Sequence, residues 1–401
     1  MPRLPFLLTA LLALAACDSA DDAPVALTAQ PQATMTPGDL RASLTAFGRI
    51  STTDISGALP EFTEYNPIFS AGLWLAGTQG GETRVNAIFY DAAESNYGPC
   101  GDGTDGVFAL SADAAYLPDG WPVAAGAPVT ADGRPRVYGD EMLWTSLCSA
   151  VSSADALQDR PLDGLRTNVA VFRYDDAPLA LYARYELRNE GTETITDAYA
   201  GQWSDPDWYG VQNNLSGYDA GRSLSYVYMS ERASPEYPDR TGELLTPQER
   251  GRVTGVAVLQ TPGDAPLAGH RMLVKNSPDS RNATVLASAG GTHESYRNIL
   301  RGLGNDGSDI TDPSGVAARF AFTGDPVAGT GWLDGRDIDG VTYGREVRSL
   351  VSAGPFTLAP GESAAFTVVW AVAAEGDLAG GLDALRQRVD GARAAPSRWR
   401  F

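Results

Sequence analysis

The sequence predicts an all-β protein: one or more antiparallel β-sandwiches, with one short C-terminal helix. Glycine and proline are abundant, with 44 and 26 residues among 401, and stretches with helical periodicity are few. Short runs of alternating apolar and polar residues recur between turn-forming residues, which is typical of antiparallel sheets. Because 43% of the residues are apolar, the chain has enough apolar surface for one large core or two ordinary ones.

The clearest strand is predicted over 179–188, where alternate residues are apolar. The turn residues 189–192 follow it, and with a strand over 194–203 they predict a β-hairpin. A second hairpin is predicted around Pro360 and Gly361, leading into a strand over 364–373. Both faces of that strand are apolar or small, so we expect it in the middle of a sandwich, covered on both sides. Further strands are expected over 83–90, 167–174, 222–229, 252–260 and 316–322.

A short amphipathic helix is predicted close to the end of the chain. Apolar residues recur at helical spacing, namely Leu378, Leu382, Leu385 and Val389. Asp377 precedes them as a candidate N-cap. Gly380 and Gly381 weaken the prediction, because glycine destabilises helix interiors.

The chain is expected to divide into a signal peptide over 1–16, a flexible tether over 17–39, an N-terminal β lobe over 40–175, a β-sandwich lobe over 176–376 and a C-terminal helix and tail over 377–401. The tether is rich in Ala, Pro, Gln and Thr and has no hydrophobic period. No linker marks the boundary between the two lobes, so a single extended sandwich is the alternative.

The first seventeen residues read as a bacterial lipoprotein signal. Arg3 precedes an apolar run over 4–14, and the small residues Ala15 and Ala16 lead into Cys17. The run is too short to span a hydrocarbon core of about 30 Å. We therefore expect a lipid on Cys17 and a protein held at the cell envelope, on the surface of the outer membrane. The alternative is an ordinary secretory signal cut after Ala16, which would also export the chain.

Two cysteines remain once Cys17 is assigned to a lipid. Cys100 and Cys148 are expected to form a disulfide, because exported proteins meet an oxidising compartment. A loop of that length would stabilise the fold by about 4 kcal/mol. Two separate buried thiols are the alternative.

Charge and motifs exclude several classes of function. The 50 acidic and 30 basic side chains give a net charge of −20, which argues against nucleic acid as a partner. No Gly-x-Ser-x-Gly elbow, His-Glu-x-x-His helix or phosphate loop occurs. The two histidines, His270 and His293, lie far apart and are expected to be ordinary structural residues.

Several motifs, in order, resemble a group of uncharacterised secreted proteins of Bacteroidota-like bacteria. They are Ser70-Ala-Gly-Leu-Trp-Leu75, Arg184-Tyr-Glu-Leu-Arg-Asn-Glu-Gly191, Trp203-Ser-Asp-Pro-Asp207, Leu224-Ser-Tyr-Val-Tyr228, Gly324-Asp-Pro-Val327, Gly329-Thr-Gly-Trp-Leu-Asp334 and Ser352-Ala-Gly-Pro-Phe-Thr-Leu-Ala-Pro-Gly361. The resemblance implies a secreted, β-rich surface protein and brings no established activity with it. Many members carry a sorting domain for type IX secretion, whereas this sequence ends at Phe401 without one.

Two acidic stretches are candidate calcium sites. The first joins Asp205, Asp207 and Asp219, with Asn213 and Asn214 between them, and calcium is bound by six to eight oxygens. In the group that the sequence resembles, more acidic residues follow this motif. The second stretch contains Asp337, Asp339 and Glu346 in an order that partly matches an EF-hand loop. The alternative is that these aspartates cap ordinary turns.

Three functions are consistent with these observations. The first is a lipid-anchored surface protein with a structural, adhesive or binding role and no catalysis, whose partner would be a glycan or another surface protein. The second is a glycan-binding or glycan-cleaving protein that uses a pair of carboxylates and exposed tryptophans, with Trp208 or Trp121 as candidates. The third is a scaffold stabilised by calcium. Other tryptophans lie in apolar strand patterns and are expected in the core, namely Trp74, Trp203 and Trp370.

Overall fold

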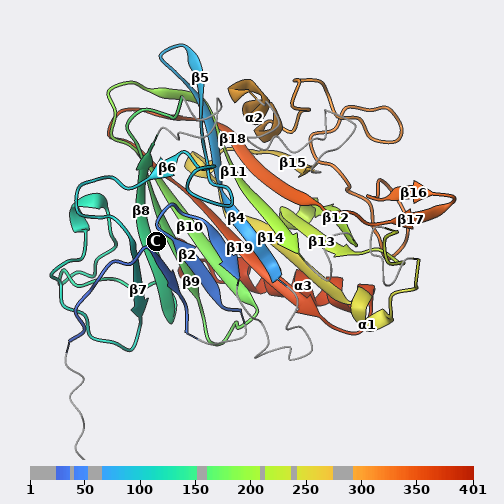
Figure 1. Cartoon of the computed structure of the whole chain (residues 1–401), viewed down its shortest axis with the longest axis horizontal. Helices are drawn as coiled ribbons and strands as arrows, with labels where there is room; N and C mark the ends of the chain where they lie inside the picture. Colours follow the sequence, from blue (N-terminus) through green and yellow to red (C-terminus); the bar gives the residue numbers. More distant parts are fainter. Residues whose placement is uncertain are drawn as a thin grey trace, which may run out of the picture.

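The computed structural model describes residues 24–36, 40–52, 66–150, 160–207, 213–235, 242–273 and 292–401. Two large antiparallel sheets face each other, which confirms the predicted all-β sandwich (Figure 1). A small two-stranded sheet of β16 (Arg336–Ile338) and β17 (Val341–Tyr343) projects from one end. Three α-helices lie in the described ranges: α1 (Pro247–Arg250), α2 (His293–Leu300) and α3 (Leu378–Ala394). None of them has the length and apolar character needed to cross a membrane.

Sheet I has eight strands in the order β1-β2-β3-β4-β11-β18-β15, with β5 beside β4. These are β1 (Gln32–Thr34), β2 (Ala42–Thr45), β3 (Ile50–Thr52), β4 (Asn66–Gln79), β5 (Glu82–Ala87), β11 (Ile195–Asp207), β15 (Leu267–Leu273) and β18 (Arg348–Leu358). Sheet II has nine strands in the order β12-β13-β14-β19-β10-β9-β8-β6, with β7 beside β8. They are β6 (Tyr97–Gly98), β7 (Val107–Ser111), β8 (Glu141–Ser149), β9 (Leu165–Arg173), β10 (Ala180–Asn189), β12 (Asn214–Asp219), β13 (Leu224–Met229), β14 (Arg252–Gln260) and β19 (Ser363–Ala374).

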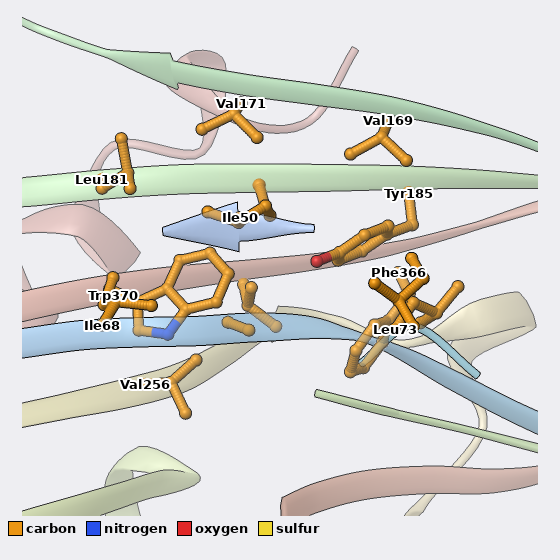
Figure 2. Packing of buried hydrophobic residues seen from close by; sticks show 14 of the residues in the cluster. Ile50, Ile68, Leu73, Val169, Val171, Leu181, Tyr185, Val256, Phe366 and Trp370 are labelled. Atoms are coloured by element: carbon orange, nitrogen blue, oxygen red, sulfur yellow. The ribbon is translucent and has the colours of Figure 1, made fainter. Parts of the chain in front are cut away.

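The main core fills the space between the two sheets. Figure 2 shows Leu73 of sheet I close to Tyr185 and Phe366 of sheet II, and all three side chains are fully buried. Alternation along the strands explains this, because every second residue of a strand points to the same face. The apolar residues of β10 that the sequence places on one face, including Leu181 and Tyr185, do lie in this core.

Strand β19 lies in the middle of sheet II between β14 and β10, and both of its faces are covered, as predicted. Its inner face carries Phe366 and Trp370. Helix α3 covers the outer face, where Leu382, Leu385 and Val389 of the helix join one cluster with Val369 of the strand. The predicted helix is thus confirmed, and it continues to Ala394.

The glycines that weaken the helix prediction have a packing role. The carboxylate of Asp377 caps the helix by accepting a hydrogen bond from the Gly380 backbone N–H at 3.0 Å. A Cβ atom at Gly381 would collide with the backbone carbonyl of Gly251, just before β14. Glycine at this position therefore allows the first turn of α3 to lie directly on the chain that enters sheet II.

Both predicted hairpins are wrong. The turn after Asn189 connects β10 in sheet II to β11 in sheet I, and the turn at Pro360 and Gly361 connects β18 in sheet I to β19 in sheet II. A short connection suffices because packed sheets lie only about 10 Å apart. The two turns are hydrogen-bonded to each other: Gly361 N–H donates to the Asn189 carbonyl at 2.7 Å, and Asn189 N–H donates to the Glu362 carbonyl at 3.0 Å.

The strand predicted over 316–322 is also wrong. This segment makes only isolated bridges, from Ala317 to Thr311 and from Phe320 to His270. It lies along the edge strand β15, where His270 N–H donates to the Arg319 carbonyl and Ala321 N–H donates to the His270 carbonyl. The apolar pattern of the segment therefore reflects its packing at the edge of sheet I.

Residues before and after residue 176 belong to the same two sheets. Strand β9, which ends at Arg173, pairs along its whole length with β10, and β4 pairs with β11. The central core likewise contains Leu73 and Val171 together with Leu181 and Val368.

Candidate functional site: a charged cluster on the outer face of sheet I

An aromatic cluster covers part of the outer face of sheet I. Trp74 of β4 and Trp203 of β11 stack with ring centroids 6.0 Å apart, and Phe89 packs edge-on against Trp203. Helix α2 closes this cluster with Tyr296, whose ring centroid lies 5.0 Å from that of Trp74. A capping box between Thr292 and Ser295 fixes the start of that helix.

Strand alternation places charged residues next to the aromatic cluster. On β11, Trp203 faces outward and Ser204 faces the core, where its hydroxyl lies 3.3 Å from Trp370 Nε1. Asp205 therefore lies on the same outer face as Trp203. The pairing of β11 with β4 is irregular between Asp205 and Asp207, and Asp207 is close enough to Asp205 and Glu346 to sense their charges. On the neighbouring strand β18, Leu350 packs into the aromatic cluster, so Arg348 shares the same face.

Tyr90, Asp205 and Arg348 form a closed, buried set of polar contacts. Arg348 Nε donates to the Tyr90 hydroxyl at 2.6 Å, and this hydroxyl donates to Asp205 Oδ2 at 2.6 Å. Arg348 Nη2 lies 3.4 Å from Asp205 Oδ2, and both side chains are 3% exposed. Burial and the charge of Asp205 raise the pKa of Tyr90 well above its usual value, so this phenol stays a neutral hydrogen-bond donor.

Asp207 extends the cluster toward solvent and has different electrostatics. Partial burial is the main cause that raises the pKa of Asp207 to about 7, and the negative charges of Asp205 and Glu346 add to it. The positive charge of Arg348 opposes this shift only in part. Glu346 is itself paired with Arg348, whose Nη2 donates to Glu346 Oε1 at 2.5 Å. A carboxyl group that holds its proton near neutral pH has the property required of a general acid.

An aromatic side chain and a second arginine border the cluster. Phe69 is 38% exposed, and its ring centroid lies 6.1 Å from that of Tyr90. The Arg49 guanidinium lies 5.6 Å from the Phe69 ring centroid and donates to the Phe69 carbonyl and to Ser70 Oγ. The arrangement offers an apolar ring and a cation side by side, next to the hydroxyl of Tyr90 and the carboxylate of Asp205.

The fold brings together some of the predicted calcium ligands and separates others. Asp205 and Asp207 meet Glu346, which the sequence assigns to the other acidic stretch. Asp219 instead pairs with Arg222 and Arg386 beside α3.

The remaining predicted ligands lie on the hairpin of β16 and β17. There Asp337 caps the turn by accepting a hydrogen bond from Gly340 N–H at 2.9 Å, and Asp339 adopts a positive φ of 54°. Within the described ranges, no three His, Cys, Asp or Glu side chains are placed to hold a metal ion. The guanidinium of Arg348 supplies the positive charge among Asp205, Asp207 and Glu346. Calcium stays a prediction.

Two other predicted site residues, Trp208 and Cys17, lie outside the described residues. Trp121 does not provide an exposed ring for sugars, contrary to expectation. It is 5% exposed, packs against Phe108 and Trp144, and donates from Nε1 to the Pro128 carbonyl at 2.8 Å. The loop that carries Trp121 folds onto the outer face of sheet II, where the ring joins an apolar cluster.

The disulfide between Cys100 and Cys148 is confirmed, with the two Cα atoms 5.0 Å apart. It belongs to the β6 and β8 edge of sheet II, whereas the charged cluster lies on sheet I. Arg166 of β9 lies against it, with Nη1 3.2 Å from Cys100 Sγ.

No protein-family model matches the chain, and no curated protein matches it. Among solved structures, a polysaccharide lyase has a TM-score of 0.32 at 9% identity, over 89% of this chain and 34% of the lyase. A protein described as an aldose 1-epimerase of Escherichia coli K12 has a TM-score of 0.33 at 12% identity, over 86% of this chain and 99% of the other. A protein of the human microbiome described as a kojibiose phosphorylase has a TM-score of 0.28 at 6% identity, over 92% of this chain and 29% of the other.

This chain therefore spans about a third of the lyase and of the phosphorylase. At TM-scores this low, none of the three resemblances assigns a fold family or an activity to the chain.

Replacing Asp207 by asparagine should make the protein more stable at alkaline pH. The unfolded carboxyl ionises near pH 4, whereas in the folded protein it keeps its proton up to about pH 7. Between these values the folded state binds more protons, so wild-type stability falls as the pH rises. We compare the free energies of unfolding of Asp207→Asn and wild type at two pH values. After discounting for partial exposure, we expect the advantage of Asp207→Asn over wild type to be about 2 kcal/mol larger at pH 8 than at pH 4.

Urea unfolding of both proteins at the two pH values measures this difference. Asp119→Asn, at an exposed position in a surface loop, is the control and should leave the pH dependence unchanged. If wild type and Asp207→Asn changed in parallel between the two pH values, the raised pKa of Asp207 would be refuted.

Proposed function

We propose that this protein is an exported glycan-binding protein and that the charged cluster on the outer face of sheet I is its binding site. The observation that carries the proposal is the exposed ring of Phe69, which lies beside Tyr90 and the Arg49 guanidinium, while Tyr90 in turn contacts Asp205 and Arg348. Ligand sites typically combine apolar or aromatic surface with a few fixed polar groups. A sugar offers the complementary chemistry, because its C–H face packs on a ring while its hydroxyls bond to carboxyl and guanidinium groups.

The charge of the protein favours a neutral glycan over a polyanion. The net charge of −20 repels phosphate-rich or heavily sulfated polymers at long range. Within the cluster, Arg348 is already paired with Asp205 and Glu346, so it offers little net positive charge to an anionic ligand. Hydroxyl groups need no net charge, since each one both donates and accepts a hydrogen bond.

Location at the cell envelope forms part of the proposal. The lipid predicted on Cys17 would anchor the protein to the outer membrane. The predicted tether over 17–39 is too long, because Gln32–Thr34 forms strand β1 of sheet I and Val25 bridges to Tyr116. Only the residues before Val25 would therefore link the sandwich to the lipid. The glycans within reach would then be those of the cell surface or its surroundings. The mass of the N-terminal peptide from native protein tests this part directly, because a diacylglyceryl group on Cys17 adds a defined mass.

A second candidate is glycan cleavage at the same site. It is favoured by one observation: Asp207 holds its proton up to about pH 7 while Asp205 is engaged by Tyr90 and Arg348. Two carboxyl groups in different environments are the usual machinery of glycoside hydrolysis. In this alternative Asp207 would be the general acid that protonates the leaving oxygen.

Glycan-array binding followed by calorimetry tests the first candidate. Wild type should bind a defined subset of glycans, and Phe69→Ala should weaken binding by about tenfold through loss of the stacking surface. The control is Val316→Ala, which removes another exposed apolar side chain in a loop remote from the cluster, and it should bind as wild type does. Absence of selective binding, or equal affinity of Phe69→Ala and wild type, would contradict the proposal.

A reducing-sugar assay on the glycans that bind separates the two candidates. Turnover by wild type that is lost in Asp207→Asn, with binding retained, would establish cleavage. Binding without turnover would leave the protein as a non-catalytic receptor.

A further inference from the structure

A cavity lies on the outer side of sheet II, whereas the charged cluster lies on the outer face of sheet I. It has a volume of about 470 Å³ and lies between the last turns of α3 and the turn that connects β9 to β10. Arg388 and Gly391 line the cavity from helix α3, and Leu179 and Tyr182 line it from the start of β10 and the turn before it. Arg398, near the C-terminus, completes the lining. This volume is in the range of sites for small organic molecules.

Small side chains on α3 create the cavity. A Cβ atom at Gly391 would meet nothing within 4 Å, so the helix surface there faces open space. Leu385 and Val389 lie on the face of the helix that packs against sheet II. Apart from the charged residues at its border, the cavity is lined mainly by alanine, proline and leucine, so it favours an apolar ligand body.

Two arginines give the cavity a positive border. Arg398 makes a two-pronged contact with Asp176, with Nη1 2.9 Å from Oδ1, and Arg388 Nη2 donates to Glu375 Oε1. Both carboxylates are more than half exposed, at 65% for Asp176 and 51% for Glu375. Exposed ion pairs of this kind are weak, so a carboxylate from a ligand can replace either partner at little cost.

Arg388 also has unused hydrogen-bonding capacity. Its Nη1 atom is buried and has no hydrogen-bond partner among the residues that the structure describes. The Arg388 side chain is 24% exposed, so a ligand in the cavity reaches the accessible part of its guanidinium. A carboxylate is the acceptor that fits a guanidinium best, because it accepts two parallel hydrogen bonds.

We propose that this cavity binds an organic acid with one carboxylate on an apolar chain or ring, such as a medium-chain fatty acid. The carboxylate would contact Arg388 and Arg398, and the apolar part would lie along Gly391 and Leu179. The site is independent of the glycan site, because α3 covers the outer face of sheet II whereas the charged cluster lies on sheet I.

Ligand-observed NMR titration of the full exported protein with octanoate tests the proposal. Wild type should bind octanoate with a dissociation constant of about 1 mM. The uncharged analogue 1-octanol should bind about tenfold more weakly, because it lacks the charge-assisted hydrogen bonds. Arg388→Gln should weaken octanoate binding by about the same factor.

Gly391→Leu is the decisive variant, because it fills the cavity and also raises helix propensity. It should abolish octanoate binding without lowering the thermal midpoint. Gln387→Leu adds the same side chain at an exposed position of α3 that does not line the cavity, and it should bind as wild type does. The proposal is overturned if Gly391→Leu binds octanoate as wild type does, or if 1-octanol binds as tightly as octanoate. Failure here would leave the glycan site untouched, since the array experiment reads the other face.

Discussion

Removing the Cys100–Cys148 disulfide should lower the free energy of unfolding by about 4 kcal/mol. The two cysteines are 48 residues apart, and the bond closes a loop that contains β7 and most of β8. Closing such a loop restricts the unfolded chain far more than the folded one, because Cys148 is already held in β8. The stabilisation therefore comes mainly from the unfolded state.

The folded state should tolerate this loss of the bond. Arg166 contacts Cys100 Sγ, but it is also held by Asp102 at 2.6 Å and by Glu190 at 3.0 Å, so its charge stays compensated. We therefore expect Cys100→Ala/Cys148→Ala to fold, with a lower midpoint of urea unfolding and a somewhat steeper dependence on urea concentration, because the unfolded chain is less compact without the bond.

Reductant gives the matched control for this prediction. Dithiothreitol should destabilise wild type to the level of the double variant and leave the double variant unchanged. A thiol assay on denatured, unreduced wild type should find no free thiol at positions 100 and 148. Two titratable thiols at these positions, or equal stability of the two proteins, would refute the prediction.

Replacing Arg348 by methionine should destabilise the protein by about 3–5 kcal/mol. The substitution removes the cation that lies 3.4 Å from Asp205. The loss is costly because both side chains are only 3% exposed, so water cannot replace the lost partner. Asp205 would then carry a buried charge with only the Tyr90 hydroxyl of this set still bonded to it. Glu346 would lose the same partner.

A double variant distinguishes this electrostatic cause from loss of packing. Arg348→Met/Asp205→Asn removes the charge together with its partner and should recover most of the lost stability, because removing both members of a buried pair costs much less than removing one. The control is Arg134→Met, which breaks the exposed pair of Arg134 with Asp132 and should cost less than about 1 kcal/mol. Urea unfolding at neutral pH measures all three. If the free energy of unfolding of Arg348→Met lay within about 1 kcal/mol of the wild-type value, Arg348 would not stabilise Asp205 and Glu346 as we infer.

Much of the fold was predictable because strand alternation depends only on which residues are apolar. The predicted range 252–260 coincides with β14, and the two apolar faces of β19 correctly placed that strand in a doubly covered position. The connections were not predictable in the same way. The turn residues at 189–192 and at 360–361 let the chain reverse, but they do not specify whether the next strand joins the same sheet or the facing one.

The candidate site was only half predictable. Asp205 and Asp207 stood out in the Trp203-Ser-Asp-Pro-Asp207 motif, as did Glu346 in its own stretch. Tyr90 and Arg348 carried no signal, because they lie 258 residues apart and meet only when β18 pairs with β11. Nothing in the local sequence of either residue encodes that pairing. The aspartates therefore looked like metal ligands, whereas the fold supplies an arginine from another strand.

The two hydrogen-bonded turns that carry the chain from one sheet to the other, β10 to β11 and β18 to β19, affect when the sheets can be completed during synthesis. Among the described strands, β15 pairs in sheet I with β18 alone, and β19 joins the β12–β14 half of sheet II to the β10–β6 half. A growing polypeptide thus lacks the central strand of one sheet and a near-edge strand of the other until its last tenth or so emerges, with ladder positions unoccupied on β10, β11 and β14. Late completion of this kind delays stable folding until most of the chain is available, because the pairings that close both sheets join strands far apart in the sequence.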